Sequence, residues 1–337
     1  MEKSRGLPVL VTGGAGYIGS HTAKALSRAG MMPVVFDNLS TGHRWAVQWG
    51  PLVEGDIADT ALLRNVLRRF GIQAVIHFAA VALVGESMEK PGHYFQTNCS
   101  GTLSLLEAMR QEGVGKLVVS SSCATYGIPE RLPISEAEPQ HPINPYGESK
   151  LMVERMLRWY EQCHGLSWAA LRYFNAAGAD PDGELGEDHK PETHLIPRVI
   201  LAALGIEAAV SVYGTDYATE DGTALRDYVH VTDLARAHVS ACRYLLRGER
   251  SDAFNLGTGQ GCSVKAVISA VEKESGRPVP YQLCPRRPGD PAELVADVSK
   301  AKKCLEWKPL HSTLENIVRT AWSWHLKHCE AAAWETL

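Results

Sequence analysis

The feature that most constrains the fold is a glycine loop between an apolar run and an amphipathic stretch. The loop, TGGAGYIGS (12–20), follows LPVLVT and opens SHTAKALSRAG. Gly13, Gly16 and Gly19 recur at every third position. In a strand–loop–helix unit, these glycines permit a tight turn, the approach of a pyrophosphate to backbone N–H groups, and close helix packing. We therefore expect a dinucleotide phosphate at the helix N-terminus.

Short apolar runs alternate with helical stretches through the first half of the chain. The runs are LPVLVT (7–12), MPVVFD (32–37), AVIHFA (74–79), KLVVSSS (116–122) and WAALRYF (168–174). Near-continuous apolar strands separated by helices are typical of a parallel sheet covered on both faces. Gly30 and Gly71 close two predicted helices, 20–30 and 60–71. The sequence therefore predicts an α/β fold with a doubly wound parallel sheet.

The pattern changes after Asn175. The stretch NAAGADPDGELGED (175–188) has neither helix nor strand periodicity, so we place a boundary there. Beyond it the sequence predicts helices over 195–204 and 231–245 and strands over 209–213 and 253–257. The last helix and strand could return to the first sheet. A chain of 337 residues has room for about two domains.

Charge and cysteine placement exclude several functions. With 34 basic and 38 acidic residues, the net charge of −4 gives no general attraction for nucleic acid or anionic membranes. No apolar run approaches the roughly 18 residues of a membrane span. The cysteines stand singly, without metal-ligand spacing: Cys99, Cys123, Cys163, Cys242, Cys262, Cys284, Cys304 and Cys329. We therefore expect a cytoplasmic protein without a metal site.

Asp37 ends the second apolar run, about twenty residues after the glycine loop. A carboxylate there can accept both hydroxyls of the adenosine ribose and would repel a 2′-phosphate, which favours NAD over NADP. A turn or capping role is the plainer interpretation of Asp37 alone. Asp56, in EGDI (54–57), follows the third strand and could meet the adenine edge, although an Asx turn explains it nearly as well.

Tyr146 and Lys150 stand four apart in INPYGESKLMVERML (143–157). Asn144 and Pro145 suit an N-cap and a first helical residue, so both side chains should share one helix face. A lysine ammonium beside the phenol is expected to lower the tyrosine pKa from about 10, making it an acid/base near neutrality. By itself, an amphipathic helix with an incidental tyrosine and lysine would be the plainer interpretation.

Three serines end the predicted strand at 116–122. Ser120, Ser121 and Ser122 would lie at the carboxyl edge of the sheet, where open α/β folds bind ligands. A hydroxyl there could bridge a substrate oxygen and Tyr146. A polar turn with backbone hydrogen bonds is the plainer interpretation of the serines alone.

With these motifs, the chain resembles the extended short-chain dehydrogenases/reductases, and within them the UDP-glucose 4-epimerases. The resemblance spans nearly the whole chain. It rests on TGGAGYIGSH (12–21), FDNLSTGH (36–43), EGDI (54–57), VIHFAA (75–80), VGESMEKP (84–91), SSSCATYG (120–127), PYGESKLMVE (145–154), LRYFNAAGA (171–179), TEDGTALRDYVHVTDLA (219–235), FNLGTGQG (254–261) and PRRPGDPAELVADVSKA (285–301).

The resemblance implies a Rossmann-like NAD-binding domain over 1–175, with returning elements near 227–258, and a smaller mixed α/β UDP-sugar-binding domain over 176–337. It implies that NAD takes the sugar C4 hydride and returns it to the other face of a transient 4-keto sugar. The implied catalytic residues are Ser122, Tyr146 as base, and Lys150. The implied cofactor contacts are Gly13, Gly16, Tyr17, Ile18, Gly19, Asp37, Asn38, Asp56, Ile57, Phe78, Ala79, Ala80, Asn98, Ser120, Tyr146, Lys150 and Tyr173.

The resemblance also implies a set of UDP-sugar contacts and a homodimer. The substrate contacts are Ser122, Tyr146, Asn175, His194, Leu195, Ser211, Tyr213, Arg226, Arg287, Asp290 and Leu294. The two arginines would hold the diphosphate with bidentate donors, and Tyr213 would face uracil. Two alternatives remain open. Arg226 could form an ion pair with the adjacent Asp227, and Tyr213 could pack in the core.

Three positions depart from the family pattern. Ala82 stands where a lysine near the cofactor often occurs, and His194 replaces an asparagine, making that hydrogen bond pH-dependent. Leu294 occupies the position whose side-chain size is thought to admit or exclude N-acetyl sugars. UDP-galactose/UDP-glucose is the expected substrate pair, with UDP-GlcNAc/GalNAc and UDP-xylose/UDP-arabinose as alternatives.

Two other functions fit less well. A nucleotide-sugar 4,6-dehydratase needs an acidic pair after the active-site hydroxyl, whereas Cys123 and Ala124 follow Ser122 here. A non-catalytic NAD-binding protein would have no reason to keep Ser122, Tyr146 and Lys150 together.

Overall fold

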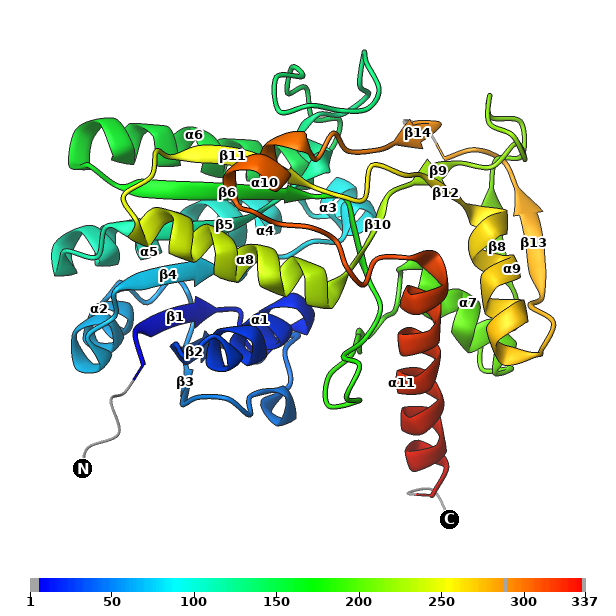
Figure 1. Ribbon diagram of the computed structural model, residues 1–337, viewed down its shortest axis with the longest axis horizontal. Helices are drawn as coiled ribbons and strands as arrows, with labels where there is room; N and C mark the ends of the chain where they lie inside the picture. Colours follow the sequence, from blue (N-terminus) through cyan, green and yellow to red (C-terminus); the bar gives the residue numbers. More distant parts are fainter. Residues whose placement is uncertain (1–5, 288–289, 335–337) are drawn as a thin grey trace.

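The computed structural model describes residues 6–287 and 290–334, and its largest unit is a seven-stranded parallel sheet (Figure 1). Across the sheet the strands are β3 (Leu52–Glu54), β2 (Met32–Asp37), β1 (Pro8–Thr12), β4 (Ala74–His77), β5 (Lys116–Ser122), β6 (Ser167–Tyr173) and β11 (Asp252–Leu256). Every neighbouring pair is parallel. The predicted doubly wound fold is confirmed.

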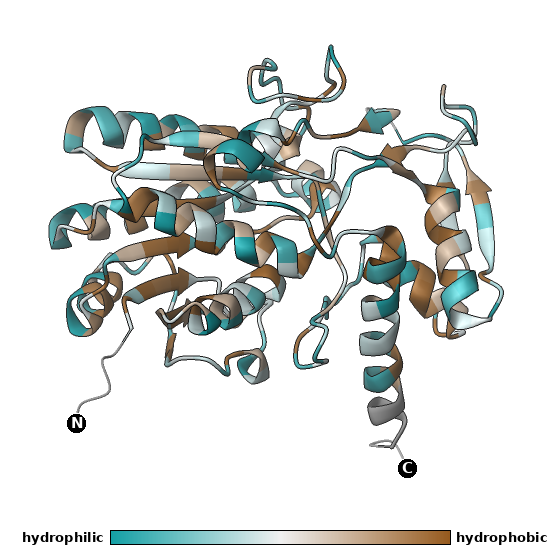
Figure 2. Cartoon of the chain, viewed as in Figure 1, coloured by the Kyte–Doolittle hydropathy of each residue, from teal (hydrophilic) through white to brown (hydrophobic). Residues whose placement is uncertain are grey.

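Helices cover both faces of this sheet because its strands are apolar on both sides. Val9 and Val11 pack with α1 (Tyr17–Arg28) and α8 (Val231–Leu246). Leu10, between them, packs on the opposite face, which is covered by α2 (Thr60–Phe70), α5 (Gly101–Glu112) and α6 (Pro145–His164). In Figure 2, β1 and β4 are hydrophobic along their length, whereas α8 alternates between hydrophobic and hydrophilic residues.

Local capping signals set the ends of several helices. Asp59 caps α2, accepting from the N–H of Leu62 at 2.9 Å, and Gly71 ends it in the left-handed region with φ 62°. Asn144 caps α6, accepting from the N–H of Gly147 at 2.8 Å. The sequence predicted these ends correctly, whereas α1 begins at Tyr17, before the predicted start at residue 20.

The second half of the chain builds a separate apolar cluster. It lies among α7 (Leu195–Ala203), α9 (Val264–Ser275), α11 (Leu314–Trp334) and β8 (Val210–Tyr213), which pairs with β13 (Tyr281–Cys284). Shorter strands join this part to the sheet: β7 (Asn175–Ala177) with β10 (Tyr228–His230), and β9 (Leu225–Arg226) between β12 (Cys262–Ser263) and β14 (Glu293–Leu294). The remaining helices are α3 (Val84–Glu89), α4 (Pro91–Tyr94), a π-helix (Phe95–Ser100), α10 (Ser299–Cys304) and the short turns Arg44–Ala46 and Cys123–Thr125.

Among the short strands that the sequence did not predict, β7 lies in the segment expected to be irregular. Residues 175–188 showed no strand periodicity, but Asn175–Ala177 form β7 because β10, some fifty residues later, supplies parallel hydrogen-bonding partners. Farther along, α8 and β11 return to the first sheet, where β11 pairs with β6. The division into domains at residue 175 stays a prediction.

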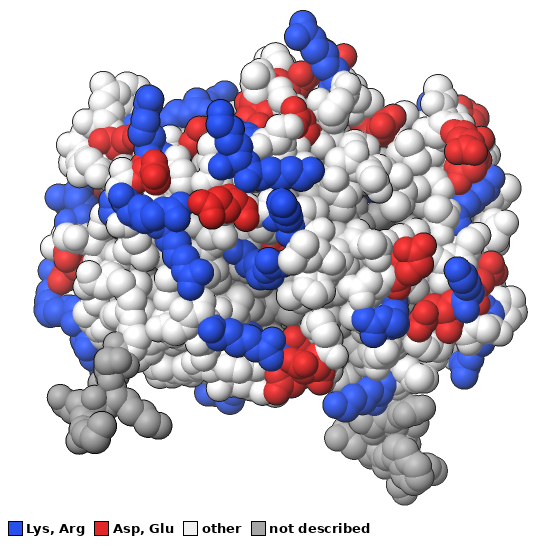
Figure 3. Space-filling model, viewed as in Figure 1, with Lys and Arg blue, Asp and Glu red and all other residues white. Residues whose placement is uncertain are grey.

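The surface carries both signs of charge. Lys and Arg side chains lie beside Asp and Glu across the face shown in Figure 3. Among the helices of the described residues, none is both long enough and apolar enough to span a bilayer.

Candidate active site

The glycine loop joins β1 to α1 with its backbone tightly enclosed. Gly13 has φ +70°, and a Cβ there would come within 2.5 Å of the backbone N of Ala79. A Cβ at Gly19 would lie 2.2 Å from the carbonyl oxygen of Gly13. At Gly16, by contrast, the nearest atom to such a Cβ is 3.4 Å away, and no side chain caps α1. The loop therefore leaves its middle glycine and the helix N-terminus open to a ligand.

Asp37, at the end of β2, holds this loop. Its carboxylate accepts from the N–H of Ala15 at 2.9 Å and from the N–H of Leu39 at 2.8 Å. Burial raises the pKa of the Asp37 carboxyl, and these two hydrogen bonds oppose the rise. Asn38 donates to one oxygen of Asp56 at 2.9 Å, while the other oxygen accepts from the N–H two residues on, so the Asx turn weighed for Asp56 is present.

Other predicted cofactor residues lie along the same edge. Phe78, Ala79 and Ala80 follow β4, and Ile57 follows β3. Asn98 is 2% exposed, and its amide is taken up by the backbone of Val81 and the hydroxyl of Ser149, at 2.9–3.0 Å. Asn98 therefore braces the loop after β4 against α6.

Ser122, Tyr146 and Lys150 meet where β5 ends beside α6. They are 7%, 9% and 6% exposed. The ammonium of Lys150 donates to the carbonyl oxygen of Ser120 at 2.9 Å and lies 5.9 Å from the centre of the Tyr146 ring. The hydroxyl of Ser122 accepts from the N–H of Ala124 at 3.1 Å. On the neighbouring strand, Tyr173 shares a hydrogen bond with the hydroxyl of Ser120.

The pKa expected for Tyr146 is wrong for this structure. Burial raises the pKa of the Tyr146 phenol to about 12, and only its contact with Ser122 lowers it. Burial lowers the pKa of Lys150 to about 8. The position of Lys150 beside Tyr146 was predicted correctly. The sequence does not show, however, how strongly burial raises the pKa of Tyr146 against the effect of the neighbouring ammonium.

A buried ion pair supports the serine end of β5. Arg172, on β6, donates to both carboxylate oxygens of Glu154, on α6, and Ser121 donates to the same carboxylate at 2.6 Å. Both charged side chains are at most 2% exposed. Sequence reasoning missed this pair, although a charged residue inside the WAALRYF run was its one signal.

Several predicted substrate residues meet on the short strands. Arg226, on β9, pairs with Asp290, so the ion pair with Asp227 is not formed. Asp227 instead accepts from the backbone N–H groups of Thr258, Gly259 and Ala296. The guanidinium of Arg287 lies 3.9 Å from the centre of the Tyr213 ring. Ser211, two residues before Tyr213, accepts from Gln282 at 3.1 Å.

Leu294 connects these strands to the end of β5. It pairs in register with Arg226 across β14 and β9. Its side chain packs against a cluster that contains Cys123, the residue after Ser122. The backbone N–H of Asn175 donates to the carbonyl oxygen of Asp227 at 3.0 Å. Residues from both halves of the chain therefore line one region.

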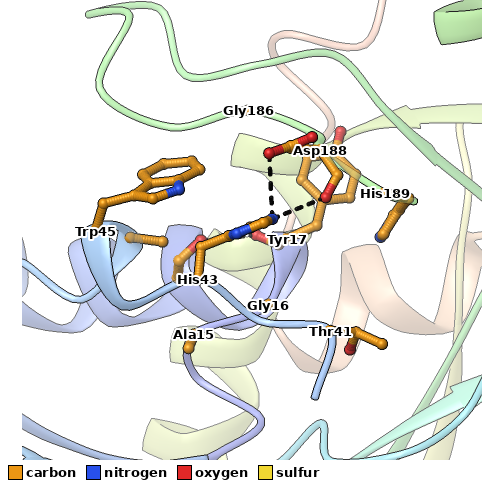
Figure 4. Close-up of a pocket in the computed structure, with 11 residues that line it drawn as sticks. Ala15, Gly16, Tyr17, Thr41, His43, Trp45, Gly186, Asp188 and His189 are labelled. Carbon is orange, nitrogen blue, oxygen red and sulfur yellow. Dashed lines mark hydrogen bonds and ion pairs between the residues drawn. The ribbon is translucent and has the colours of Figure 1, made fainter. Parts of the chain in front are cut away.

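The segment before α7 lies against the glycine loop (Figure 4). The hydroxyl of Tyr17 donates to the carbonyl oxygen of Gly178 at 2.5 Å. His43 contacts Asp188, with a ring nitrogen 3.2 Å from its carboxylate. His189 lines the same pocket, edge-on to Tyr17 with ring centres 6.3 Å apart.

His194 occupies the N-cap position of α7, next to Leu195, without a side-chain capping bond, and its ring faces a carboxylate. Its ring contacts Glu187. Burial lowers the pKa of His194, but the Glu187 carboxylate outweighs burial and raises it. Burial raises the pKa of the Glu187 carboxyl, but His194 and His189 outweigh burial and lower it to about 2. The pH-dependent hydrogen bond expected from His194 to the substrate stays a prediction. Sequence reasoning missed Glu187 and His189, which the spacing Glu-x-His-x-x-Glu-x-His could have suggested.

Comparison with known proteins decides the family. The model of the NAD dependent epimerase/dehydratase family matches residues 9–257. The chain belongs to this family. It is 52% identical over 322 residues to UDP-glucose 4-epimerase of Rhizobium leguminosarum bv. trifolii, covering 96% of this chain and 98% of the relative.

Two solved structures are similar in fold. UDP-glucose 4-epimerase of Brucella ovis in complex with NAD has a TM-score of 0.93 and 54% identity, covering 94% of this chain and 98% of that chain. The enzyme of Stenotrophomonas maltophila, with bound NAD and formylated UDP-arabinopyranose, has a TM-score of 0.94 and 40% identity, covering 96% and 99%.

The residues at the loop fit the cofactor of the family. The open side of Gly16, the uncapped N-terminus of α1 and the carboxylate of Asp37 at the end of β2 are what a dinucleotide requires.

Proposed function

We propose that this protein interconverts UDP-galactose and UDP-glucose by NAD-dependent epimerisation at C4 of the sugar. The observation that carries the proposal is the meeting of Ser122, Tyr146 and Lys150 at the sheet edge that also bears the glycine loop. A serine and a tyrosine hydroxyl beside a lysine suit proton transfer to and from a sugar hydroxyl. The high similarity to UDP-glucose 4-epimerases supports the same activity.

Tyr146 would take the proton from the 4-hydroxyl while Ser122 hydrogen-bonds the same oxygen. When bound, NAD supplies the hydride acceptor and a positive charge on its nicotinamide ring. A positive charge there would favour the phenolate, because burial raises the pKa of Tyr146 to about 12. Lys150 would hold the nicotinamide ribose and stabilise the phenolate from its place beside the ring.

The substrate nucleotide would lie on the short strands. Arg226 and Arg287 would hold the diphosphate, Tyr213 would stack on uracil, and Asp290 would accept from a ribose hydroxyl. The contact between Arg287 and Tyr213 supports this grouping. Since Arg226 and Asp290 pair with each other, both side chains would be positioned before the nucleotide arrives. Asn175, His194, Leu195 and Ser211 would complete the contacts.

Leu294 would set the size limit for the sugar. It lies beside Arg226 and packs toward Cys123, between the nucleotide and catalytic residues. Leucine is intermediate in size, so UDP-GlcNAc/GalNAc and the UDP-xylose/UDP-arabinose pair are the alternative substrates. A panel of UDP-sugars given to wild type and Leu294→Tyr tests this role. We expect the N-acetyl sugars to lose turnover selectively in the variant; equal turnover in both proteins would remove Leu294 as the determinant.

We further infer a cytoplasmic homodimer. The eight cysteines are all free, which suits a reducing compartment. Leu103 on α5 and Met152 and Trp159 on α6 are 43%, 37% and 64% exposed, and apolar side chains gathered on neighbouring helices suit a helix-on-helix interface. Analytical ultracentrifugation should give twice the chain mass; a monomer at micromolar concentration would contradict the dimer.

Incubation of the purified protein with UDP-galactose tests the proposed function. Chromatography should show UDP-glucose forming without accumulation of NADH, because the cofactor is regenerated in every turnover. Absence of UDP-glucose, or release of NADH in proportion to substrate, would contradict the proposal.

A further inference from the structure

Two histidines and two glutamates converge just before α7. Glu187, His189, Glu192 and His194, called here the His/Glu cluster, each offer one ligand atom, and these atoms all lie within 4.8 Å of one another. Nδ1 of His189 is 3.1 Å from Oε1 of Glu187 and 3.7 Å from Oε2 of Glu192. Nδ1 of His194 contacts the same oxygen of Glu187 and lies 3.7 Å from Oε1 of Glu192. Both imidazoles thus place a nitrogen within 3.7 Å of both carboxylates.

The spacing of these atoms suits a small cation. Zinc binds nitrogen and oxygen ligands at about 2.0–2.2 Å in a tetrahedron, so neighbouring ligand atoms stand about 3.3–3.6 Å apart. The distances of 3.1 and 3.7 Å around His189 lie on either side of that range. The contact between His194 and Glu187 is tighter and would lengthen around a cation.

One nitrogen of the cluster lacks a partner. Nδ1 of His189 is enclosed, yet within the described part of the chain it forms no hydrogen bond. Its distance of 3.1 Å to Glu187 is short enough for one, so the orientation of the ring is what prevents it. An enclosed nitrogen without a partner is costly, and a cation between nitrogen and carboxylate would satisfy both.

The charges of the His/Glu cluster also favour a bound cation. The side chains of Glu187 and Glu192 are 3% and 9% exposed, and a dication that displaces the protons of both imidazoles would neutralise these two enclosed carboxylates. The nearby acidic group of Asp180, Asp182 and Glu184 does not need a metal ion to balance its charge in the same way, because the ammonium of Lys24 already pairs with all three carboxylates. His194 is 49% exposed and leaves a route for entry.

We propose that the His/Glu cluster binds one divalent transition-metal cation, with Zn²⁺ the best match. Imidazole and carboxylate together suit zinc, whereas magnesium and calcium prefer oxygen ligands alone. The cation would fasten the segment from Glu187 to His194 beside Tyr17, at the open N-terminus of α1. This site does not depend on the proposed function, and its test does not use activity.

Metal loading of the untagged protein tests the site. Protein stripped with EDTA, reloaded with Zn²⁺ and desalted should retain about one zinc per chain by elemental mass spectrometry. Loading with Co²⁺ instead should give the intense visible absorption of a four-coordinate site, and Zn²⁺ should raise the melting temperature. No retained zinc, or a Co²⁺ spectrum like that of the hydrated ion, would overturn the proposal.

Substitutions locate the metal. His189→Gln and Glu192→Gln should each retain less than about a tenth of the wild-type zinc, because each removes a ligand. His164→Gln, at an exposed histidine that ends α6, is the matched control and should retain all of it. Zinc retained by either cluster variant would place the ion elsewhere and overturn the proposal. If one variant fails to fold, as its circular dichroism would show, the other decides.

Discussion

The carboxyl edge of the large sheet and the short strands of the second half hold their side chains in different ways. At the sheet edge, Ser122, Tyr146 and Lys150 are at most 9% exposed, and a buried ion pair lies beneath them. In the second half, Arg287, which follows β13, is exposed, and Tyr213, on β8, is half-buried. Proton transfer needs fixed geometry, whereas Arg287 and Tyr213, which would hold the nucleotide, must be accessible before it binds. The difference suggests that chemistry and recognition are carried by separate parts of one site.

Replacing Tyr146, which carries the phenol at the sheet edge, is the sharpest test of this separation between chemistry and recognition. We expect Tyr146→Phe to lower kcat by about 10²–10⁴-fold, because it removes the proton acceptor. Bound NAD, released by denaturation and measured by absorbance, should remain at the wild-type level. Unchanged kcat would remove Tyr146 as the base.

The second test concerns the support beneath that edge. Glu154→Gln should lower the free energy of unfolding by about 3–5 kcal/mol, because Arg172 would be left as an unpaired buried charge. Urea unfolding measures the change. Glu54→Gln is the control: Glu54 pairs with Arg44, both are more than half exposed, and the expected cost is below about 1 kcal/mol. Equal losses in the two variants would refute a specially supported sheet edge.

On the short strands, Arg287→Ala should raise KM for UDP-galactose by about 10- to 150-fold, since a hydrogen bond to a charged group is worth roughly 1.5–3 kcal/mol. The change in kcat should be smaller. Arg286→Ala is the matched control, because Arg286 pairs with Asp216 at 2.7 Å and lies over Tyr217 instead. A loss of kcat at constant KM would mean that recognition and chemistry are not divided as described.

The smallest expected effect is a pH dependence of the sheet edge. His77, at the end of β4, bonds the hydroxyls of Thr12 and Thr102 at 2.7 and 2.9 Å, and burial lowers the pKa of His77 to about 3. Because the unfolded chain binds this proton near pH 6.5, stability should be lost as the pH falls from about 6.5 toward 3.

Between pH 7 and pH 5, this histidine should cost about 2 kcal/mol of unfolding free energy. His77→Gln keeps polar atoms near Thr12 and Thr102 but removes the titration, so urea unfolding at the two pH values should show a weaker dependence. An identical dependence in variant and wild type would show that His77 does not titrate on unfolding.

The sequence predicted those parts of the fold and site that depend on neighbours along the chain. Gly13, Gly16 and Gly19 identify the loop because the turn itself requires them, and Asn144 with Pro145 marks the start of α6 because capping is local. The location of the candidate site at the carboxyl edge follows from the prediction of a parallel sheet.

The remainder depends on contacts between distant residues. The pair between Arg226 and Asp290 joins positions far apart, and so does that between Lys24 and Asp180. The pKa of Tyr146 depends on how completely α6 and β5 enclose it, which spacing cannot show. For Asn98, the resemblance implied a cofactor contact, which stays a prediction, whereas the bonds of its amide to Val81 and Ser149 appear only in the structure.

In the proposed reaction, the hydride removed from C4 of the sugar returns to the same carbon. UDP-galactose deuterated at C4 tests it most directly, with the product examined by mass spectrometry and proton NMR. The UDP-glucose formed should retain deuterium at C4, even in ordinary water. UDP-glucose carrying hydrogen from solvent at C4 would contradict it.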